Sequence, residues 1–133
     1  LAKALLGAGK LDGMVPFLYM DHKAARPAEP PPGATAENGA YIVRTFGCRN
    51  CHGPELSGQK VPGGSPLIAP NITPGGSIGD WSEDDFLTMI QEQESPEMPW
   101  VTLRAMTDDE QRALYRYLMS LPKLPSTPAP TKS

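Results

Sequence analysis

The stretch Cys48-Arg49-Asn50-Cys51-His52 holds the only two cysteines of the chain, and a histidine follows the second one directly. Three kinds of site use two cysteines separated by two residues: structural zinc, thioredoxin-like redox thiols and covalently attached haem. The surrounding sequence decides how well each of them fits.

A structural zinc site needs four ligands. Beyond Cys48, Cys51 and His52, only His22 offers another strong nitrogen donor. A thioredoxin-like pair is expected where a strand leads into a helix. Here the motif ends a predicted helix and enters a glycine-rich loop. A small structural disulfide beside a surface histidine is a further alternative.

Cys-x-x-Cys-His is also the attachment motif of c-type haem. Thioether bonds from Cys48 and Cys51 would hold the edge of the porphyrin. The next residue, His52, would then lie under the iron as its proximal ligand. The motif favours covalent haem, and zinc, redox thiols and a disulfide stay open as alternatives.

The composition indicates one small domain with much irregular backbone. The chain has 133 residues, is 39% hydrophobic, and contains 16 prolines and 13 glycines. A small domain with so many loops usually needs a staple or a cofactor to complete its core. The net charge is -3, and no run of lysines or arginines is present, which argues against a nucleic-acid partner.

No apolar segment reaches the roughly 20 residues that a membrane-spanning helix needs. The first residue is Leu1 rather than methionine, which leaves room for an upstream signal, anchor or further domain. Residues 1–22 open with a short helical pattern in which Leu1, Leu5 and Leu6 share a face. Residues 23–33 are rich in proline and are expected to form an extended linker.

Three helices are predicted in the remainder of the chain. The first follows a cap at Thr35, and Tyr41, Ile42, Thr45 and Phe46 would share one face. Residues 53–80 hold seven glycines and five prolines, too many for a long helix or a central strand.

The two later helices begin at capping boxes. One starts after Ser82 with Phe86, Met89 and Ile90 on its apolar face, and should end before Pro96. The last follows Thr107, carries Leu114, Tyr117, Leu118 and Leu121 on one face, and stops at Pro122.

Together these features resemble a class I cytochrome c domain over about residues 35–121. The resemblance rests on the first helix, CRNCHG, Asn71-Ile72-Thr73, Gly79-Asp80-Trp81-Ser82, Met98-Pro99-Trp100 and the final Leu-Tyr-Arg-Tyr-Leu helix. It is similar to single-haem domains of membrane-attached dehydrogenases and respiratory chains. The resemblance implies an all-α fold of three to five helices and long loops around one covalent haem c. It also implies that the first and last helices cross, with Gly39 among the contact positions.

The same resemblance implies Met98 as the sixth iron ligand, in an irregular segment between two predicted helices. A thioether ligand raises the reduction potential. Met106, His22 and an open position are the alternatives. The other methionines are interpreted as packing residues or precede the haem domain; they are Met14, Met20, Met89 and Met119.

Further cofactor contacts are implied at Pro66, Asn71 and Trp81. His52 is expected to donate its free ring hydrogen to a carbonyl in the loop around Pro66 and Leu67, which fixes the ring. Asn71 and Trp81 are candidate donors to a haem propionate. Alternatively, Asn71 serves the turn completed by Pro74 and Gly75, and Trp81 only lines the crevice.

The expected function is single-electron transfer without a catalytic residue. The rival is a haem-based gas sensor or peroxidase-like enzyme whose sixth ligand is displaced. The expected organisation is an N-terminal extension or linker (1–34), a haem domain (35–122) and a disordered tail (123–133). The resemblance implies redox protein partners, such as a quinol-oxidising complex, a dehydrogenase or a terminal oxidase. It also implies a bacterial periplasmic location or the outer face of the cytoplasmic membrane, with attachment through an upstream segment.

Overall fold

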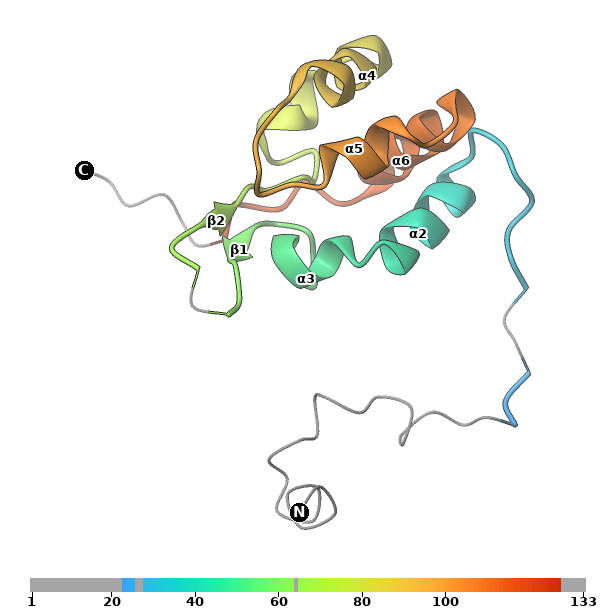
Figure 1. Cartoon of the computed structure of the whole chain (residues 1–133), viewed down its shortest axis with the longest axis horizontal. Coiled ribbons are helices and arrows are strands. Elements are labelled where there is room, and N and C mark those ends of the chain that lie inside the picture. The colour runs from blue at the N-terminus through green and yellow to red at the C-terminus, as the bar shows by residue number, and fades with distance from the viewer. Residues whose placement is uncertain (1–22, 26–27, 64, 128–133) are drawn as a thin grey trace.

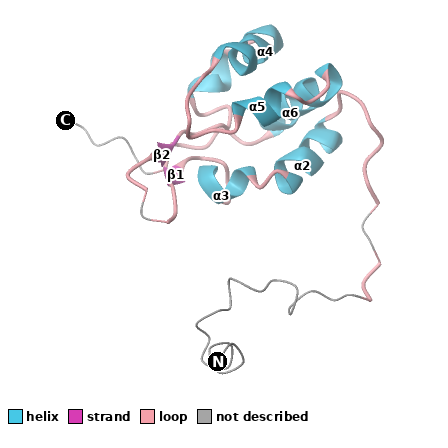
Figure 2. Ribbon diagram, viewed as in Figure 1, coloured by secondary structure: helices cyan, strands magenta, loops and turns pink. Residues whose placement is uncertain are grey.

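The computed structural model describes residues 23–25, 28–63 and 65–127. Its elements, in chain order, are α2 (Ala36–Thr45), α3 (Cys48–His52), β1 (Gln59–Lys60), β2 (Ile68–Ala69), the 3₁₀ helix η2 (Ser77–Asp80), α4 (Glu83–Glu92), α5 (Trp100–Arg104) and α6 (Asp108–Ser120). This described part is mostly helical, as predicted, with five α-helices and one pair of short strands (Figures 1 and 2). The helical pattern predicted in residues 1–22 lies outside the described residues.

Helix α2 begins where the sequence predicts, but its buried face differs from the predicted one. The Asn38 N–H donates to Thr35 Oγ1 (3.1 Å), which caps the helix. The buried residues are Asn38, Gly39, Ile42 and Val43. Thr45 and Phe46 are exposed, so of the four residues predicted on one face only Ile42 is buried, and the predicted face was wrong. The helix ends at Thr45 rather than continuing into the cysteine motif.

Helices α2 and α6 form the main packing contact of the body, and Figure 1 shows them side by side. Gly39 lies at their closest approach. A Cβ at this position would overlap the Ala113 carbonyl oxygen and would come within 2.6 Å of Tyr117 Cβ. The predicted crossing of the first and last helices at Gly39 is therefore confirmed.

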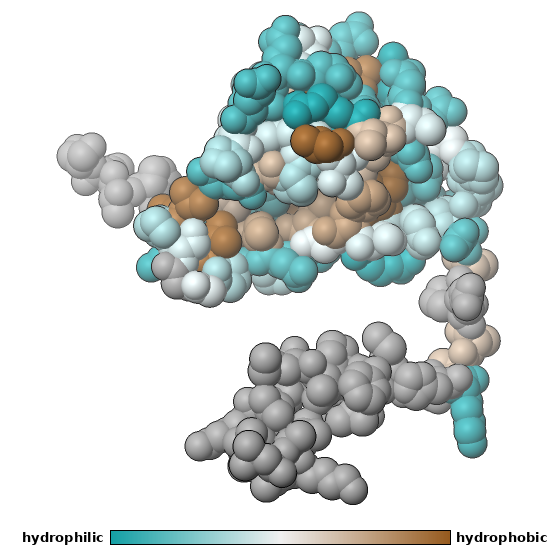
Figure 3. Space-filling view, viewed as in Figure 1, coloured by the Kyte–Doolittle hydropathy of each residue, from teal (hydrophilic) through white to brown (hydrophobic). Residues whose placement is uncertain are grey.

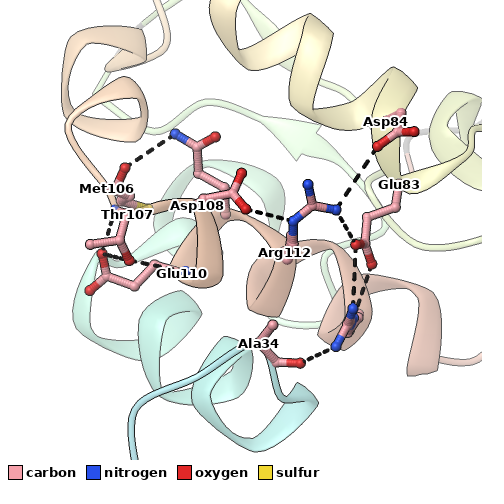
Figure 4. Close-up of polar contacts among 10 residues, drawn as sticks. Ala34, Glu83, Asp84, Met106, Thr107, Asp108, Glu110 and Arg112 are labelled. Carbon is pink, nitrogen blue, oxygen red and sulfur yellow. Dashed lines mark hydrogen bonds and ion pairs between the residues drawn. The ribbon is translucent and has the colours of Figure 1, made fainter.

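Both predicted capping boxes are present. Ser82 accepts from the Asp85 N–H and Asp85 accepts in return from the Ser82 N–H, which starts α4. Thr107 and Glu110 make the same reciprocal pair at the start of α6 (Figure 4). Each box satisfies backbone donors that the first turn of a helix leaves unpaired.

An ion-pair network joins α4 to α6 and to the end of the linker (Figure 4). Glu83 accepts from Arg112 (2.6 Å) and from Arg116 (2.9 Å). Arg116 also donates to the Ala34 carbonyl oxygen (2.5 Å), just before the Thr35 cap. The network therefore fixes where the linker meets the helical body.

The elements described within residues 53–80 are the short β1, β2 and η2, in agreement with the prediction that glycine and proline leave no room for a long helix or central strand. Gln59 pairs with Ala69 and Lys60 with Ile68 in the short antiparallel hairpin β1–β2. Leu56 is fully buried although its φ is 59°, a conformation that costs a side chain energy. Its carbonyl accepts from the Ile72 N–H (2.9 Å), which closes the loop over the core.

The first residues of the segment predicted as a tail make hydrogen bonds with the body. Residues 123–127 are held against the body, because the Thr127 N–H donates to the Ser57 carbonyl oxygen (2.8 Å) and the Leu124 carbonyl accepts from Asn71 (2.8 Å). Residues 128–133 lie outside the described part. Over the described residues, no helix combines the length and the apolar character needed to cross a membrane.

Candidate functional site

The cysteine motif forms one helical turn, α3, bounded by two glycines. Gly47 has φ 68° and breaks the chain away from α2, and Gly53 has φ 87° where α3 ends. Residues three apart in a helix lie on the same face. Cys48 and Cys51 thus lie on one side of this turn, as two free thiols.

The two thiols differ in burial. Cys48 is half-buried and packs against the core, whereas Cys51 is exposed. Burial raises the pKa of the Cys48 thiol, although nearby Arg49 acts in the opposite direction. Arg49 donates to Tyr117 Oη (2.9 Å) and so fastens α3 to α6. The turn that carries the thiols is therefore held on the helical body.

His52 is the most buried member of the motif, with 5% of its surface exposed. Its Nδ1 lies 2.8 Å from the Pro70 carbonyl oxygen. A carbonyl only accepts, so Nδ1 carries the proton and Nε2 holds the lone pair. Among the described residues, Nε2 makes no hydrogen bond.

The electrostatics of His52 favour its neutral form. Burial lowers the pKa of the imidazole, and the hydrogen bond to Pro70 opposes this effect in part. A neutral imidazole with a fixed tautomer is the form that ligates a metal. Within the described part of the chain, His52 thus keeps one ring nitrogen without a hydrogen-bond partner, and it directly follows the two cysteines in sequence.

The carbonyl that orients His52 is Pro70, not one around Pro66 and Leu67 as predicted. Pro66 and Leu67 are exposed at the end of the β1–β2 hairpin, before β2. Pairing of β2 with β1 brings the segment that follows it, rather than the hairpin end, back to His52. The sequence feature that could have pointed to Pro70 is its position directly before Asn71, one of the predicted contact residues.

Met98 lies in a tight turn between α4 and α5. The Trp100 N–H donates to the Met98 carbonyl oxygen (2.8 Å) around Pro99, whose φ of −77° and ψ of 62° define an inverse γ-turn. Trp100 Nε1 donates to Ser95 Oγ (2.9 Å) and closes the same segment. Met98 is half-buried against the core.

The other methionines share part of this environment. Met89, Met106 and Met119 are also half-buried against the core, so burial alone does not separate them from Met98. Met106 follows α5, and its carbonyl accepts from Gln111 (3.4 Å). Met14 and Met20, together with His22, lie outside the described residues.

Asn71 and Trp81 are each engaged with the protein. Asn71 is 4% exposed; its Oδ1 accepts from the Thr73 N–H (2.9 Å) and its Nδ2 donates to Leu124. The turn role considered for Asn71 is thus present. Trp81 is half-buried against the core, and its carbonyl accepts from Tyr115 Oη (2.8 Å). Their predicted contacts with a propionate stay predictions.

The residues around the motif fit a c-type haem. Two free thiols on one turn and, directly after them, a nearly buried histidine whose Nε2 makes no hydrogen bond to a described residue are donors that such a group uses. Met98 is half-buried against the core, as are three other methionines, and its role as a ligand stays a prediction. In the view of Figure 3, apolar side chains run across the middle of the body, between more hydrophilic surfaces above and below. No group of three or more His, Cys, Asp or Glu side chains gathers to hold a metal ion in the part of the chain that the structure describes.

Three curated proteins are similar to this chain. The cytochrome c subunit of gluconate 2-dehydrogenase from Pantoea cypripedii is 32% identical, with 65% of this chain and 23% of that protein covered. The fructose dehydrogenase cytochrome subunit of Gluconobacter japonicus is 28% identical, with 80% of this chain and 26% of that protein covered. The cytochrome c subunit of the quinone alcohol dehydrogenase of Gluconobacter oxydans is 29% identical, with 65% of this chain and 21% of that protein covered.

All three relatives are cytochrome subunits of dehydrogenases. The similarity to dehydrogenase-type cytochromes expected from the sequence is thereby shown. The chain spans about a quarter of the length of these relatives, at 21% to 26%. No protein-family model and no solved structure matches the chain.

Proposed function

We propose that this chain is a single-electron carrier that holds one haem c through Cys48 and Cys51 and ligates its iron through His52 and Met98. The observation that carries the proposal is the buried His52 ring, directly after two free thiols: Nδ1 is bonded to Pro70, and Nε2 has no hydrogen-bond partner among the residues that the structure describes. The similarity to cytochrome subunits of dehydrogenases supports it.

When bound, the haem supplies a one-electron iron couple. The chain's own residues bind it and set its properties. Cys48 and Cys51 anchor the group, and neutral His52 offers a lone pair whose direction Pro70 sets. The Met98 thioether favours the ferrous state. The γ-turn at Pro99 fixes the backbone from which the Met98 side chain extends.

The proposed role is that of an electron-transfer subunit, with substrate chemistry residing in a partner. The relatives favour a dehydrogenase as that partner over a quinol-oxidising complex or a terminal oxidase. We propose a bacterial periplasmic location or the outer face of the cytoplasmic membrane, with attachment through an upstream segment. Covalent haem attachment of this kind occurs outside the cytosol, which supports this placement.

The test is an absorption spectrum of the protein made in a host that attaches c-type haem, oxidised and then reduced. Met98→Ala is compared with Met106→Ala, because both methionines are half-buried against the core. We expect haem that survives denaturation and acid extraction in all three proteins. The weak red-edge band of ferric methionine ligation should vanish only in Met98→Ala, and the reduction potential should fall in that variant.

Two results would contradict the proposal. A protein that carries no covalent haem would return the motif to zinc or thiol chemistry. Rapid and tight binding of carbon monoxide by the reduced, unmodified protein would favour the gas sensor or peroxidase-like enzyme, because such a site has a displaceable sixth ligand.

A further inference from the structure

We infer that residues 123–127, here called the C-terminal strap, are a positioning segment that holds His52 in its ligand orientation. The inference rests on the proposed function, because it assigns the strap a role toward the proximal ligand. It follows from two sets of hydrogen bonds that hold the strap. One reaches the residue next to the carbonyl that accepts from the His52 ring, and the other reaches the residue next to the N–H that donates to the His52 main chain.

The first attachment acts through Asn71. Its Nδ2 donates to the Leu124 carbonyl oxygen (2.8 Å), and its Oδ1 accepts from Thr73 Oγ1 (2.8 Å). Asn71 directly follows Pro70, whose carbonyl oxygen receives the His52 Nδ1 proton. The strap is thus bonded to the residue next to the group that orients the ring, and Asn71 is a positioning residue.

The second attachment acts through the main chain. The Thr127 N–H donates to the Ser57 carbonyl oxygen (2.8 Å). The next residue, Gly58, donates its N–H to the His52 carbonyl oxygen (2.9 Å). The strap therefore spans both segments that contact His52 and ties them to each other.

Two glycines allow the strap to lie directly on these segments. A Cβ at Gly58 would lie 2.9 Å from the Thr127 carbonyl oxygen and 2.8 Å from that of Ala69. A Cβ at Gly75 would overlap the Leu124 carbonyl oxygen and lie 2.8 Å from the Leu124 nitrogen. The fit is backbone against backbone, so a single methyl group at Gly75 displaces the strap without touching His52.

The consequence for the ligand has a defined sign. A hydrogen bond from Nδ1 to a carbonyl makes the imidazole a stronger donor, which stabilises ferric iron. If the Pro70 carbonyl is held less firmly, this hydrogen bond weakens. The ferrous state then becomes more stable relative to the ferric state, and the reduction potential rises. Solvent entry into the site would act in the opposite direction, because exposure favours the more highly charged ferric state.

The experiment compares four haem-loaded proteins. They are the full chain, a chain stopped after Pro122, a chain stopped after Thr127 as the matched control, and full-length Gly75→Ala. Covalent haem is measured after denaturation, and the methionine band reports the intact sixth ligand. The reduction potential and the paramagnetic shifts of the haem methyl groups, which depend on the orientation of the histidine ring, are the decisive readouts.

We expect equal haem content in all four proteins. The chain stopped after Pro122 and Gly75→Ala should show changed methyl shifts and a ferrous-to-ferric ratio raised about threefold, or about 28 mV at 59 mV per tenfold for one electron. The chain stopped after Thr127 should match the full chain. If the chain stopped after Pro122 does not fold, the result for Gly75→Ala decides.

Two outcomes overturn the inference alone: unchanged potential and methyl shifts in the haem-loaded strap variants, or a potential that falls while the methyl shifts stay unchanged, which is the effect of solvent entry without a change in the orientation of the histidine ring. Either would leave the haem content and the proposed function intact. Absence of covalent haem from the full chain overturns the proposed function, and this inference with it, and the haem assay shows that result separately.

Discussion

Gly39 lies where α2 crosses α6, and the opposite helix leaves no room for a side chain there. We expect Gly39→Val to lower the free energy of unfolding by about 3 kcal/mol, because an added side chain in a packed contact forces backbone shifts. Chemical denaturation of the haem-loaded protein measures this change.

Thr45→Val is the matched control for this prediction. It places the same side chain in the same helix at an exposed position. Exposed substitutions usually change stability by less than about 0.5 kcal/mol. Equal effects of the two substitutions would show that valine is poorly tolerated anywhere in α2, and that the crossing is not what Gly39 serves.

At the residue scale, the sequence predicts which neighbouring residues make up the candidate site, but not which distant residue accepts the hydrogen bond from His52. Cys48, Cys51 and His52 lie within five consecutive residues, so their proximity can be predicted without knowing the tertiary structure. The partner of His52 is 18 positions away, and only the pairing of β1 with β2 determines that Pro70 rather than Pro66 reaches it. The two-residue strands carry too little pattern for that register to be read from sequence.

Between elements, Glu83 is the carboxylate that links α4 to two arginines of α6. Hydrogen bonds from Arg116 and Arg112 hold the pKa of Glu83 below its ordinary value of 4.5. A carboxyl whose pKa is lowered on folding stabilises the fold above its unfolded value, and this contribution is lost as pH falls through the folded value. The link should therefore weaken in acid, below pH 4.5.

We expect Glu83→Gln to lower the unfolding temperature by a few degrees at pH 7. The difference from the unmodified protein should shrink as the pH falls below the ordinary pKa of Glu83. Thermal unfolding at a series of pH values measures it. Asp84→Asn is the control, because Asp84 lies 3.9 Å from Arg112 and is 89% exposed. A difference for Glu83→Gln that stays constant with pH would contradict the assignment.

The elements themselves show where local patterns suffice. The helices α4 and α6 begin at predicted capping boxes, because both partners of each box lie within four residues. The buried face of α2 was misplaced because Gly39 and Asn38, neither of them bulky and apolar, face the core. The strap was missed for a similar reason: its contacts are made by the backbone, and proline-rich composition gives no sign of them.

Across the whole molecule, the protein core is small. Eleven hydrophobic residues are buried within residues 28–63 and 65–127, and three of them, Leu56, Ala69 and Ile78, come from the segment between α3 and α4. Small domains with so limited a core usually depend on a staple or a cofactor. An apolar band stays visible on one face (Figure 3), and a bound haem would shield apolar surface of that kind.

The fold should therefore depend on the bound group. We expect the double variant Cys48→Ala/Cys51→Ala, which has no thiol to attach haem, to lose helical circular dichroism and to unfold at a markedly lower temperature than the haem-loaded chain. A group bound only by the folded state stabilises it in proportion to its affinity. The single variant Cys51→Ala is the control: its thiol is exposed, so its removal costs little packing while Cys48 still attaches the group. An unchanged unfolding temperature in the colourless double variant would show that the helical body is stable by itself, and the apolar band would then need another explanation.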